Sequence, residues 1–186
     1  STLLASSAAS DVYKRQVLKY LSEYFKITLL YFNPNISPKE EYEKRVAEQK
    51  RLIEQMKFKY PVTMLEGRYE PSEFYEAVKG LENVPEGGER CFICYEMRMR
   101  EAAEYARRTG ADFFTTTLSI SPLKNADKIN EIGKKLEAEY GVRHLPSDFK
   151  KKEGYKQSIE LSKEYNLYRQ NFCGCVFSKN GDKENV

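Results

Sequence analysis

The residues best suited to chemistry in this chain are its cysteines. All four stand in two close pairs, Cys91-Phe92-Ile93-Cys94 and Cys173-Gly174-Cys175, and no cysteine is left over. Each spacing lets two sulfurs reach one metal centre, and four thiolates suit zinc or an iron–sulfur cluster. We therefore expect the fold to bring both pairs together around a metal site. Composition alone does not separate zinc from iron.

Local geometry supports this expectation for each pair. Cys91 and Cys94 are three residues apart at the predicted start of a helix, which places both sulfurs on one face. The partial positive charge of a helix amino terminus also favours thiolates. In the second pair, Gly174 lets the backbone turn so that neighbouring sulfurs can face one centre. A redox-active dithiol and unrelated buried thiols are the alternatives to metal ligation.

Length and composition describe one domain without a membrane segment. The chain has 186 residues, 31 basic and 28 acidic side chains, and a net charge of +3. Its mean hydropathy is −0.70, and no apolar run approaches the ~20 residues of a membrane span. Without a signal peptide, four cysteines do not indicate a secreted disulfide framework. The balanced charge does not by itself indicate a nucleic-acid partner, although a local basic patch is compatible with it.

The first sixteen residues read as foreign sequence. Ser6 to Gln16 (SSAASDVYKRQ) is the translation of a common transposon-based sequencing adapter, and the DNA upstream of that adapter accounts for Ser1 and Thr2. We therefore expect residues 1–16 to be an adapter-derived artefact, with the native chain beginning at or before Val17 and its true amino terminus missing. The segment can nevertheless mimic a strand at Thr2 to Ala5.

Beyond that segment, strand and helix signals alternate along the chain. Strands are expected at Lys26–Phe32, Tyr60–Leu65, Ala111–Thr117 and Val142–Leu145. Helices are expected at Val17–Phe25, Ser37–Lys57 with Ser37 as cap, Pro71–Lys79, Cys91–Arg108, Asn125–Tyr140 with Asn125 as cap, and Tyr155–Tyr165. This alternation predicts an α/β domain with a mainly parallel sheet over residues 17–178, followed by a polar tail at 179–186.

Ligands of such folds bind beyond the carboxyl ends of the strands. Three loops follow predicted strands and are expected to meet there: Asn33–Asn35, Thr117–Lys124 and Asp148–Tyr155. Each could equally be an ordinary surface turn. His144, the single histidine, lies on a short predicted strand and is expected to be structural.

Several stretches together resemble one family, the QueH-type epoxyqueuosine reductases. They are YFNPNISPKEEYEKR, GGERCFICYEMRM, FFTTTLSISPLKNADKINEIG and DFKKKEGYKQSIELSKEYNLYRQNFCGC, and the resemblance covers nearly everything from Ile27 to Ser178. It implies a Rossmann-like fold, related to the adenine-nucleotide α-hydrolases, with added carboxyl-terminal helices. It also implies a cytoplasmic oxidoreductase that removes the epoxide oxygen from epoxyqueuosine at the tRNA wobble position, the last step to queuosine.

The resemblance carries ligands and partners with it. Cys91, Cys94, Cys173 and Cys175 match family cysteines and would bind a 4Fe–4S cluster and a second mononuclear metal, iron or zinc. Asp148 would help to hold that second metal as a catalytic group. The partners implied are tRNA bearing epoxyqueuosine and an electron donor of unidentified nature. The substrate-binding residues expected beside these are Asn33, Ser119, Ser121, Lys124, Lys150, Lys151, Lys152, Tyr155 and Arg169.

The chain departs from the family at its start. Family members open with a strand and a His-x-Cys-Cys-x-x-Cys-like segment, whereas Leu3 to Asp11 contains neither cysteine nor histidine. The departure implies that the two cysteine pairs are the surviving part of a larger site. On that interpretation they are shared between the cluster and the second metal, and the chain as given is inactive.

Two other functions compete with the reductase. One is a zinc-stabilised RNA-binding module without catalysis. The other is an adenylating or ATP-pyrophosphatase-type enzyme on the same fold class, which predicts a glycine-rich phosphate loop after the first strand. No such loop is visible in the sequence.

Overall fold

The protein is an α/β domain built on a five-stranded parallel sheet. The computed structural model describes residues 1–7, 11–121, 123–149 and 172–178. The strand order is β3-β2-β1-β4-β5, and every neighbouring pair runs parallel. This confirms the fold class predicted from the alternation of strand and helix signals.

Most elements lie within two residues of their predicted boundaries, whereas the first helix begins six residues before the predicted Val17 and ends four residues before Phe25. The strands are β1 (Thr2–Ser6), β2 (Lys26–Tyr31), β3 (Val62–Glu66), β4 (Phe113–Thr116) and β5 (Arg143–His144). The helices are α1 (Asp11–Leu21), α2 (Lys39–Gln55), α3 (Pro71–Ala77), α4 (Glu89–Thr109) and α5 (Ala126–Tyr140), with short 3-10 turns η1 (Leu118–Ile120) and η2 (Val176–Ser178). The helix predicted at Tyr155–Tyr165 falls outside the described residues.

Strand β1 occupies the centre of the sheet, between β2 and β4. Its side chains alternate between the two faces, as a strand requires. Leu3 and Ala5 pack with α1, whereas Leu4 packs with α4 and α5. Residues 2–6, which belong to the adapter-like segment, thus form the central strand. The family resemblance implies a strand at this position. The origin of the segment stays a prediction.

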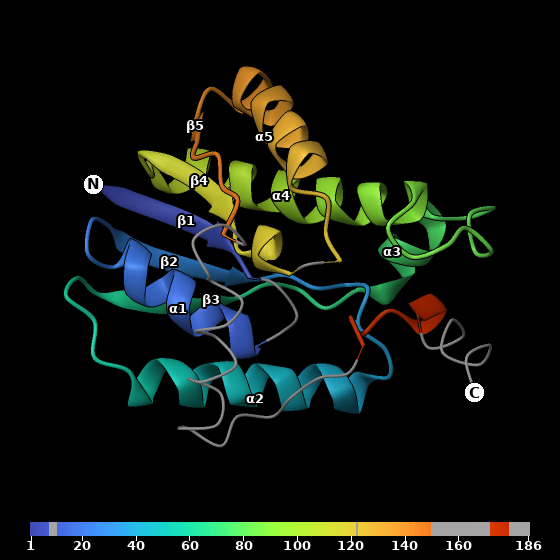
Figure 1. The fold of residues 1–186 in the computed structure, drawn as a ribbon, viewed down its shortest axis with the longest axis horizontal. Helices are drawn as coiled ribbons and strands as arrows, with labels where there is room; N and C mark the ends of the chain where they lie inside the picture. The colour runs from blue at the N-terminus through green and yellow to red at the C-terminus, as the bar shows by residue number, and fades with distance from the viewer. Residues whose placement is uncertain (8–10, 122, 150–171, 179–186) are drawn as a thin grey trace.

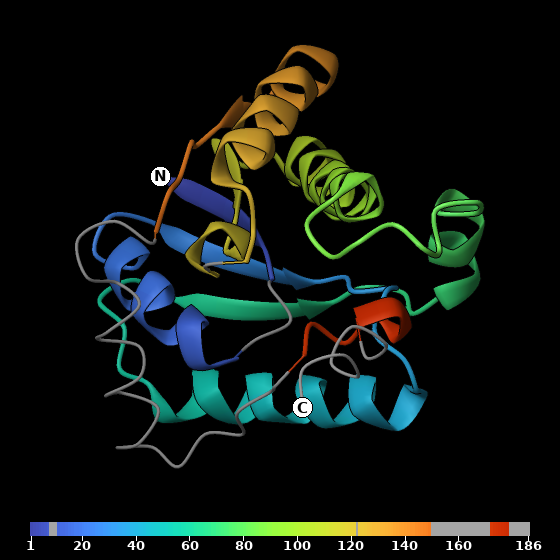
Figure 2. The same ribbon diagram turned by 45° about the vertical axis from the view of Figure 1, so that its right-hand side comes forward.

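The helices cover both faces of the sheet. Helices α1 and α2 lie on one side, and α4 and α5 lie on the other (Figures 1 and 2). The larger apolar core lies beneath α4 and α5 and includes Tyr95, Met99, Phe114 and Leu136. Helix α3 and η2 lie together beyond the ends of the strands, beside the amino-terminal end of α4.

The helix boundaries test the capping predictions. Asn125 caps α5, since its Oδ1 accepts the Lys128 backbone N–H at 3.0 Å. Gly110 and Gly141 end α4 and α5 in the left-handed conformation that glycine tolerates best. The prediction for Ser37 is wrong: Pro38 occupies the N-cap of α2, and no side chain caps that end. The Ser37 backbone N–H instead donates to the Gly174 carbonyl, so tertiary contact replaces the local cap.

The strand order places a topological switch between β1 and β4. The chain runs from β1 to β2 and β3 on one side of the sheet, and then crosses back to β4 and β5 on the other side. The loops after β1 and β4 therefore diverge, and folds of this class bind ligands at such a point. Thr117 seals the base of this region, where its backbone N–H donates to the Ser6 carbonyl at 3.0 Å. Within the described residues, no helix is long and apolar enough to cross a membrane.

Candidate functional site

The first cysteine pair lies at the amino-terminal end of α4. The helix begins at Glu89, two residues before Cys91, with Gly88 as its N-cap. The Cys91 sulfur is buried and accepts the Gly87 backbone N–H at 3.3 Å. This hydrogen bond fixes the direction of the Cys91 side chain at the start of the helix.

The second pair is seated on α2 by a buried arginine. Arg45 is fully buried, and its guanidinium donates to the carbonyls of Phe172 and Cys173 at 3.3 and 3.2 Å. Gly174 adopts φ +94°, and a Cβ at this position would lie 2.8 Å from Ile36. Glycine is therefore required twice at this turn, for its backbone angle and for the close approach to the α2 region.

The fold brings the two pairs together from segments about eighty residues apart. Cys94, Cys173 and Cys175 share one apolar cluster with Phe74, Val78, Ile93, Met97 and Phe177. Cys91 lies close enough for its charge to act on Cys94. Within the described residues, however, no three His, Cys, Asp or Glu side chains stand in an arrangement that could hold a metal ion.

The thiols of the second pair share a proton unequally. A hydrogen bond from Cys175 lowers the pKa of Cys173 to about 5 against the effect of burial, with help from Lys124 and Ser178. The same hydrogen bond, together with burial, raises the pKa of Cys175. Burial also raises the pKa of Cys94, partly offset by Arg98. The Cys173 sulfur thus carries charge readily, whereas Cys94 and Cys175 require a nearby cation or metal to do so.

Lys124 supplies such a cation. Its side chain is only 10% exposed, and its Nζ lies 3.1 Å from Glu86 and 5.9 Å from the centroid of the Tyr95 ring. Burial alone lowers the pKa of Lys124, but the charges of Cys173, Tyr95 and Glu86 outweigh it and raise the pKa overall. Lys124 therefore faces the thiols as an ammonium. Its role as a substrate-binding residue stays a prediction.

Buried polar groups without partners accompany the thiols at this edge of the sheet. Asn33 is fully buried just beyond β2, and neither its amide oxygen nor its amide nitrogen has a hydrogen-bond partner. The Ser6 hydroxyl, the Tyr95 hydroxyl and the Arg98 Nε are in the same condition. Because buried polar groups are normally satisfied, such a set indicates a place where a ligand or water completes the hydrogen bonds.

Ser119 is occupied within the protein. It is fully buried after β4, and its hydroxyl lies 3.0 Å from the Ser147 hydroxyl. Asn130 holds the same loop, donating to the Ser147 carbonyl at 3.1 Å. The hydrogen bond between Ser119 and Ser147 therefore joins the loop after β4 to the loop after β5.

Ser121 and Asp148 are half-buried in those same two loops. The Ser121 carbonyl accepts the Lys124 backbone N–H at 3.1 Å, which helps to fix that lysine. Asp148 follows Ser147 directly. The remaining predicted substrate residues lie outside the described residues: Lys150, Lys151, Lys152, Tyr155 and Arg169.

His144 is packed as a structural residue. It is 6% exposed on β5, its ring is tilted against that of Phe114 with the centroids 5.1 Å apart, and it contacts Gly133 of α5. Burial lowers its pKa to about 4, so the imidazole is neutral at pH 7.

Two buried arginines of the site were missed by sequence reasoning. Arg45 holds the second pair, while Arg90 donates to the carbonyls of Leu81 and Glu82 at 3.0 and 2.8 Å and orders the loop before Cys91. Arg90 also lies 5.0 Å from the centroid of the Phe177 ring. In sequence, Arg45 and Glu41 have the spacing of an exposed i, i+4 ion pair, which gives no sign of burial. Arg90 could have been found, because it directly precedes Cys91.

The donor chemistry fits a thiolate-bound metal group. Four soft sulfur ligands, one of them readily ionised, gather beside a buried ammonium in a largely apolar setting. Taken alone, the described side chains do not form a closed cage. The arrangement can therefore contribute thiolates to a cluster or metal, and it leaves polar groups next to it for a substrate.

Comparisons with known proteins agree with this chemistry. Residues 3–181 match the family model "Epoxyqueuosine reductase QueH". Proteins of that name from Streptococcus pyogenes and Staphylococcus epidermidis are 41% and 43% identical over 87% of this chain, covering 64% and 69% of their own lengths. One from Thermotoga maritima is 39% identical over 80% of the chain and 77% of its own length. The chain thus spans about two thirds of the length of the first two relatives.

A solved structure shares the fold. The U34-tRNA thiolase NcsA from Methanococcus maripaludis, determined with its [4Fe-4S] cluster, matches 95% of this chain and 61% of its own with a TM-score of 0.51 and 11% identity. At that identity the likeness concerns the fold alone.

Proposed function

Because the chain belongs to the epoxyqueuosine reductase QueH family, we propose that it reduces epoxyqueuosine to queuosine in tRNA with an iron–sulfur centre. The observation that carries the proposal is the convergence of Cys91/Cys94 and Cys173/Cys175 at the carboxyl edge of the sheet. Topology places ligand sites of this fold class at that edge, so the family and the geometry indicate the same location.

The proposed reaction converts an epoxide into an alkene and water. It consumes two electrons and two protons, with tRNA as substrate and an electron donor as second partner. Cys91, Cys94, Cys173 and Cys175 would be shared between the 4Fe–4S cluster and a second metal, iron or zinc, which Asp148 would help to hold. When bound, these groups supply electrons singly and a Lewis acid for the epoxide oxygen.

The side chains beside the thiols provide the remaining chemistry. The Tyr95 hydroxyl, whose pKa burial raises to about 12, and the Lys124 ammonium both hold protons that can reach the departing oxygen. Asn33 offers a donor and an acceptor of the kind that reads the polar edge of a base. Because these groups are buried, a nucleotide must leave its stack to reach them, as in other enzymes that modify bases.

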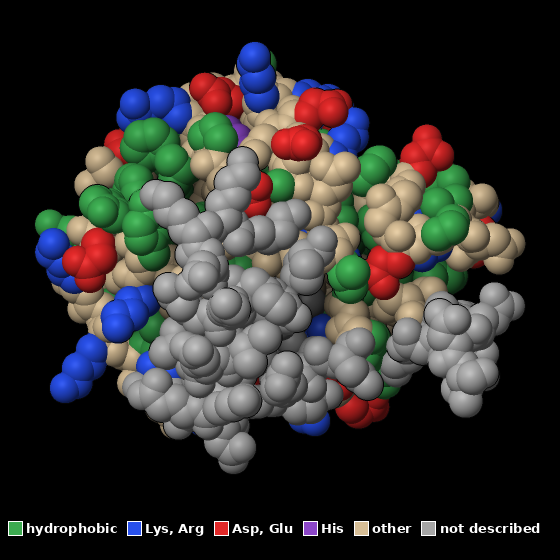
Figure 3. All heavy atoms as spheres, viewed as in Figure 1, with side chains coloured by type: hydrophobic (Ala, Val, Ile, Leu, Met, Phe, Trp, Pro, Cys, Tyr) green, Lys and Arg blue, Asp and Glu red, His purple; other side chains and the backbone are tan. Residues whose placement is uncertain are grey.

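The charge distribution on one face of the molecule bears on where the tRNA binds. Basic and acidic side chains alternate around the rim of the face in Figure 3, with no broad area of one sign among the described atoms. The proposed tRNA contacts therefore include Lys150, Lys151, Lys152, Tyr155 and Arg169, beyond the described residues. A cytoplasmic location is part of the same proposal.

The test is to purify the full chain anaerobically, reconstitute it with ferrous iron and sulfide, and measure iron, sulfide and zinc per chain. We expect a brown protein with bound iron and sulfide. Once a family-type start with its cysteines replaces residues 1–16, we also expect conversion of epoxyqueuosine in tRNA to queuosine, measured by mass spectrometry of the nucleosides. A colourless protein with one zinc per chain and no turnover would instead establish the RNA-binding module.

A further inference from the structure

Arg45 is the only fully buried charged side chain among the described residues, and it has an unusual set of partners. Its Nε donates to Glu41 at 2.7 Å, one turn earlier on α2. Its two terminal nitrogens donate to the carbonyls of Phe172 and Cys173, 127 and 128 residues away in sequence. Its guanidinium also lies 5.0 Å from the centroid of the Phe172 ring. These contacts join Arg45 to the Phe172–Cys173 segment and to Glu41, which fixes the orientation of the guanidinium.

The same segment is held from the other side by the loop after β2. The Ser37 backbone N–H donates to the Gly174 carbonyl at 3.0 Å, and Ile36 closes against Gly174. A Cβ on Gly174 would also meet the Arg45 guanidinium at 3.1 Å. Three consecutive carbonyls, at 172, 173 and 174, are therefore accounted for by α2 and its preceding loop.

The contacts of Arg45 and Ser37 with residues 172–174 orient the sulfurs of the second pair. With the carbonyls of Phe172, Cys173 and Gly174 directed toward α2, the Cys173 and Cys175 side chains enter the cluster with Cys94. The first pair needs no such anchor, because α4 fixes both of its sulfurs through helix geometry. Within the turn, Ser178 donates to the Cys175 carbonyl, whereas the carbonyls of residues 172 to 174 are bonded by Arg45 and Ser37.

We propose that Arg45 is the positioning residue of the metal centre: its buried guanidinium sets the geometry of the Cys173–Cys175 turn so that this pair meets Cys91 and Cys94. The inference rests on the proposed function and deepens it. Arginine suits the task because its planar fork donates to several acceptors at once, whereas a lysine offers a single point of charge.

The experiment measures the reactivity of each thiol in the metal-free full chain. Iodoacetamide alkylation at one fixed pH, followed by peptide mass spectrometry, gives separate rates for the first and second pairs. For Arg45→Met we expect alkylation of Cys173 and Cys175 to accelerate at least about tenfold, because two hydrogen bonds from a charged donor are lost. Alkylation of Cys91 and Cys94 should change less than about twofold, since α4 is intact.

Two further variants keep the result decisive. Arg45→Lys should give an intermediate acceleration confined to the second pair, and Gly174→Ala should reproduce it from the opposite side of the contact. Arg51→Met is the matched control: it removes an arginine from the same helix, one that is 37% exposed and paired with Glu48, and should leave all four rates unchanged. Wild-type rates for the second pair in Arg45→Lys and Gly174→Ala, or equal acceleration of both pairs in every Arg45 variant, would overturn the proposal.

Iron binding separates this inference from the function on which it rests. In Arg45→Met we expect the iron retained after reconstitution to fall at least about tenfold relative to Arg51→Met, in keeping with the effect of groups that orient metal ligands. If the wild-type chain binds no iron, the proposed function fails. The alkylation rates still test whether Arg45 holds the Cys173–Cys175 turn. If Arg45→Met retains iron at the wild-type level with selective alkylation, the positioning role for the metal is refuted.

Discussion

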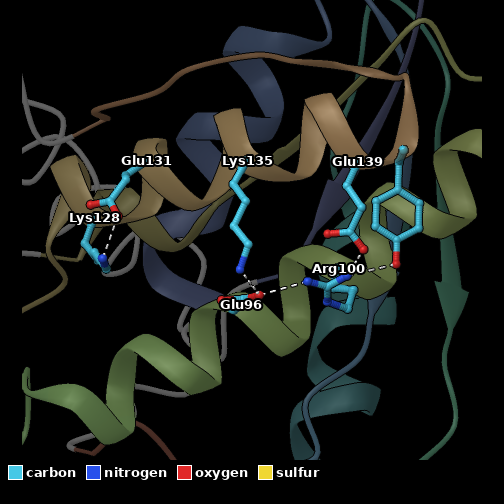
Figure 4. Close-up of polar contacts among 7 residues, drawn as sticks. Glu96, Arg100, Lys128, Glu131, Lys135 and Glu139 are labelled. Atoms are coloured by element: carbon cyan, nitrogen blue, oxygen red, sulfur yellow. Dashed lines mark hydrogen bonds and ion pairs between the residues drawn. The ribbon is translucent and has the colours of Figure 1, made fainter.

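Arg98 and Arg100 stand two residues apart on α4, yet they are used in opposite ways. Arg100 is on the outer face, where it contacts Glu96, Glu139 and Tyr140 (Figure 4). Arg98 is 3% exposed on the inner face, where it donates to the Ser7 carbonyl and leaves its Nε without a partner. The outer face satisfies its charges within the protein, whereas the inner face retains hydrogen-bonding capacity that a ligand can use.

Figure 4 shows how complete the outer arrangement is. Glu96 accepts from Arg100 at 2.8 Å and from Lys135 of α5 at 2.9 Å, and Lys128 pairs with Glu131 at 2.7 Å. Lys135 and Glu139 join α5 to α4 through Glu96 and Arg100, whereas the Lys128–Glu131 pair lies within α5. The charges of these side chains are thus paired within the protein. Changes on the outer face should therefore alter stability alone, and changes on the inner face should alter chemistry first.

The largest effect should come from the inner face. Cys94→Ser exchanges sulfur for oxygen with little change in volume, so we expect the thermal midpoint of the metal-free chain to stay within about 3 °C of wild type, because the packing is retained. Iron retention and turnover of epoxyqueuosine tRNA should fall by at least about 100-fold, since a thiolate ligand is lost.

Arg100→Met on the same helix is the control for this comparison and should leave iron and turnover unchanged. Full iron content in Cys94→Ser would remove that residue from the site.

A change between α5 and β5 should break the scaffold. Gly133→Ala places a Cβ 2.2 Å from the His144 ring, and a rigid helix offers little room for relief. We expect a loss of about 3 kcal/mol in the free energy of unfolding, measured by denaturant titration. Adding His144→Ala should recover most of that loss. Additive losses in the double variant would show that the ring is not the obstacle.

The buried His144 should make stability depend on pH. Its pKa is lowered from 6.5 in the unfolded chain to about 4 in the fold, so the unfolded state binds the extra proton between these values. The contribution of the neutral His144 to the free energy of unfolding is fully present above pH 6.5. It is lost as the pH falls toward 4, and the total loss is up to about 3 kcal/mol.

His144→Gln supplies the reference, because all carboxylates titrate equally in both proteins. Unfolding titrations at pH 7, 5.5 and 4 should show the wild type losing more stability than this variant. Parallel losses in the two proteins would show that the histidine titrates normally in the fold.

The smallest effect should come from the outer ion pairs. Arg100→Met removes contacts of a side chain that is 35% exposed, and we expect a loss below about 1 kcal/mol that shrinks in high salt. Denaturant titrations at low and high salt measure it, with Lys135→Met as the partner variant on α5. A loss well above 1 kcal/mol would place the outer face among the determinants of the fold.

The sequence alone predicts most of the strands and helices. Apolar runs, glycine stops and the Asn125 cap predict β2, α4, β4 and α5 within a few residues, because these signals act over one or two turns of chain. The cysteine spacing likewise indicates a thiolate site from chemistry that is local to each pair. The family resemblance joins the two pairs in one function.

Only the tertiary structure decides what surrounds those sulfurs. In sequence, Arg45 gives no sign of burial, and Lys124 is expected only as a substrate-binding residue, since charged side chains are rarely buried. In the fold, Arg45 contacts a segment 128 residues away, and Lys124 lies among thiols from both pairs. Arg98 and Arg100 differ for the same reason. Which face of a helix is buried, and against which distant segment, depends on contacts that residue type and spacing do not encode.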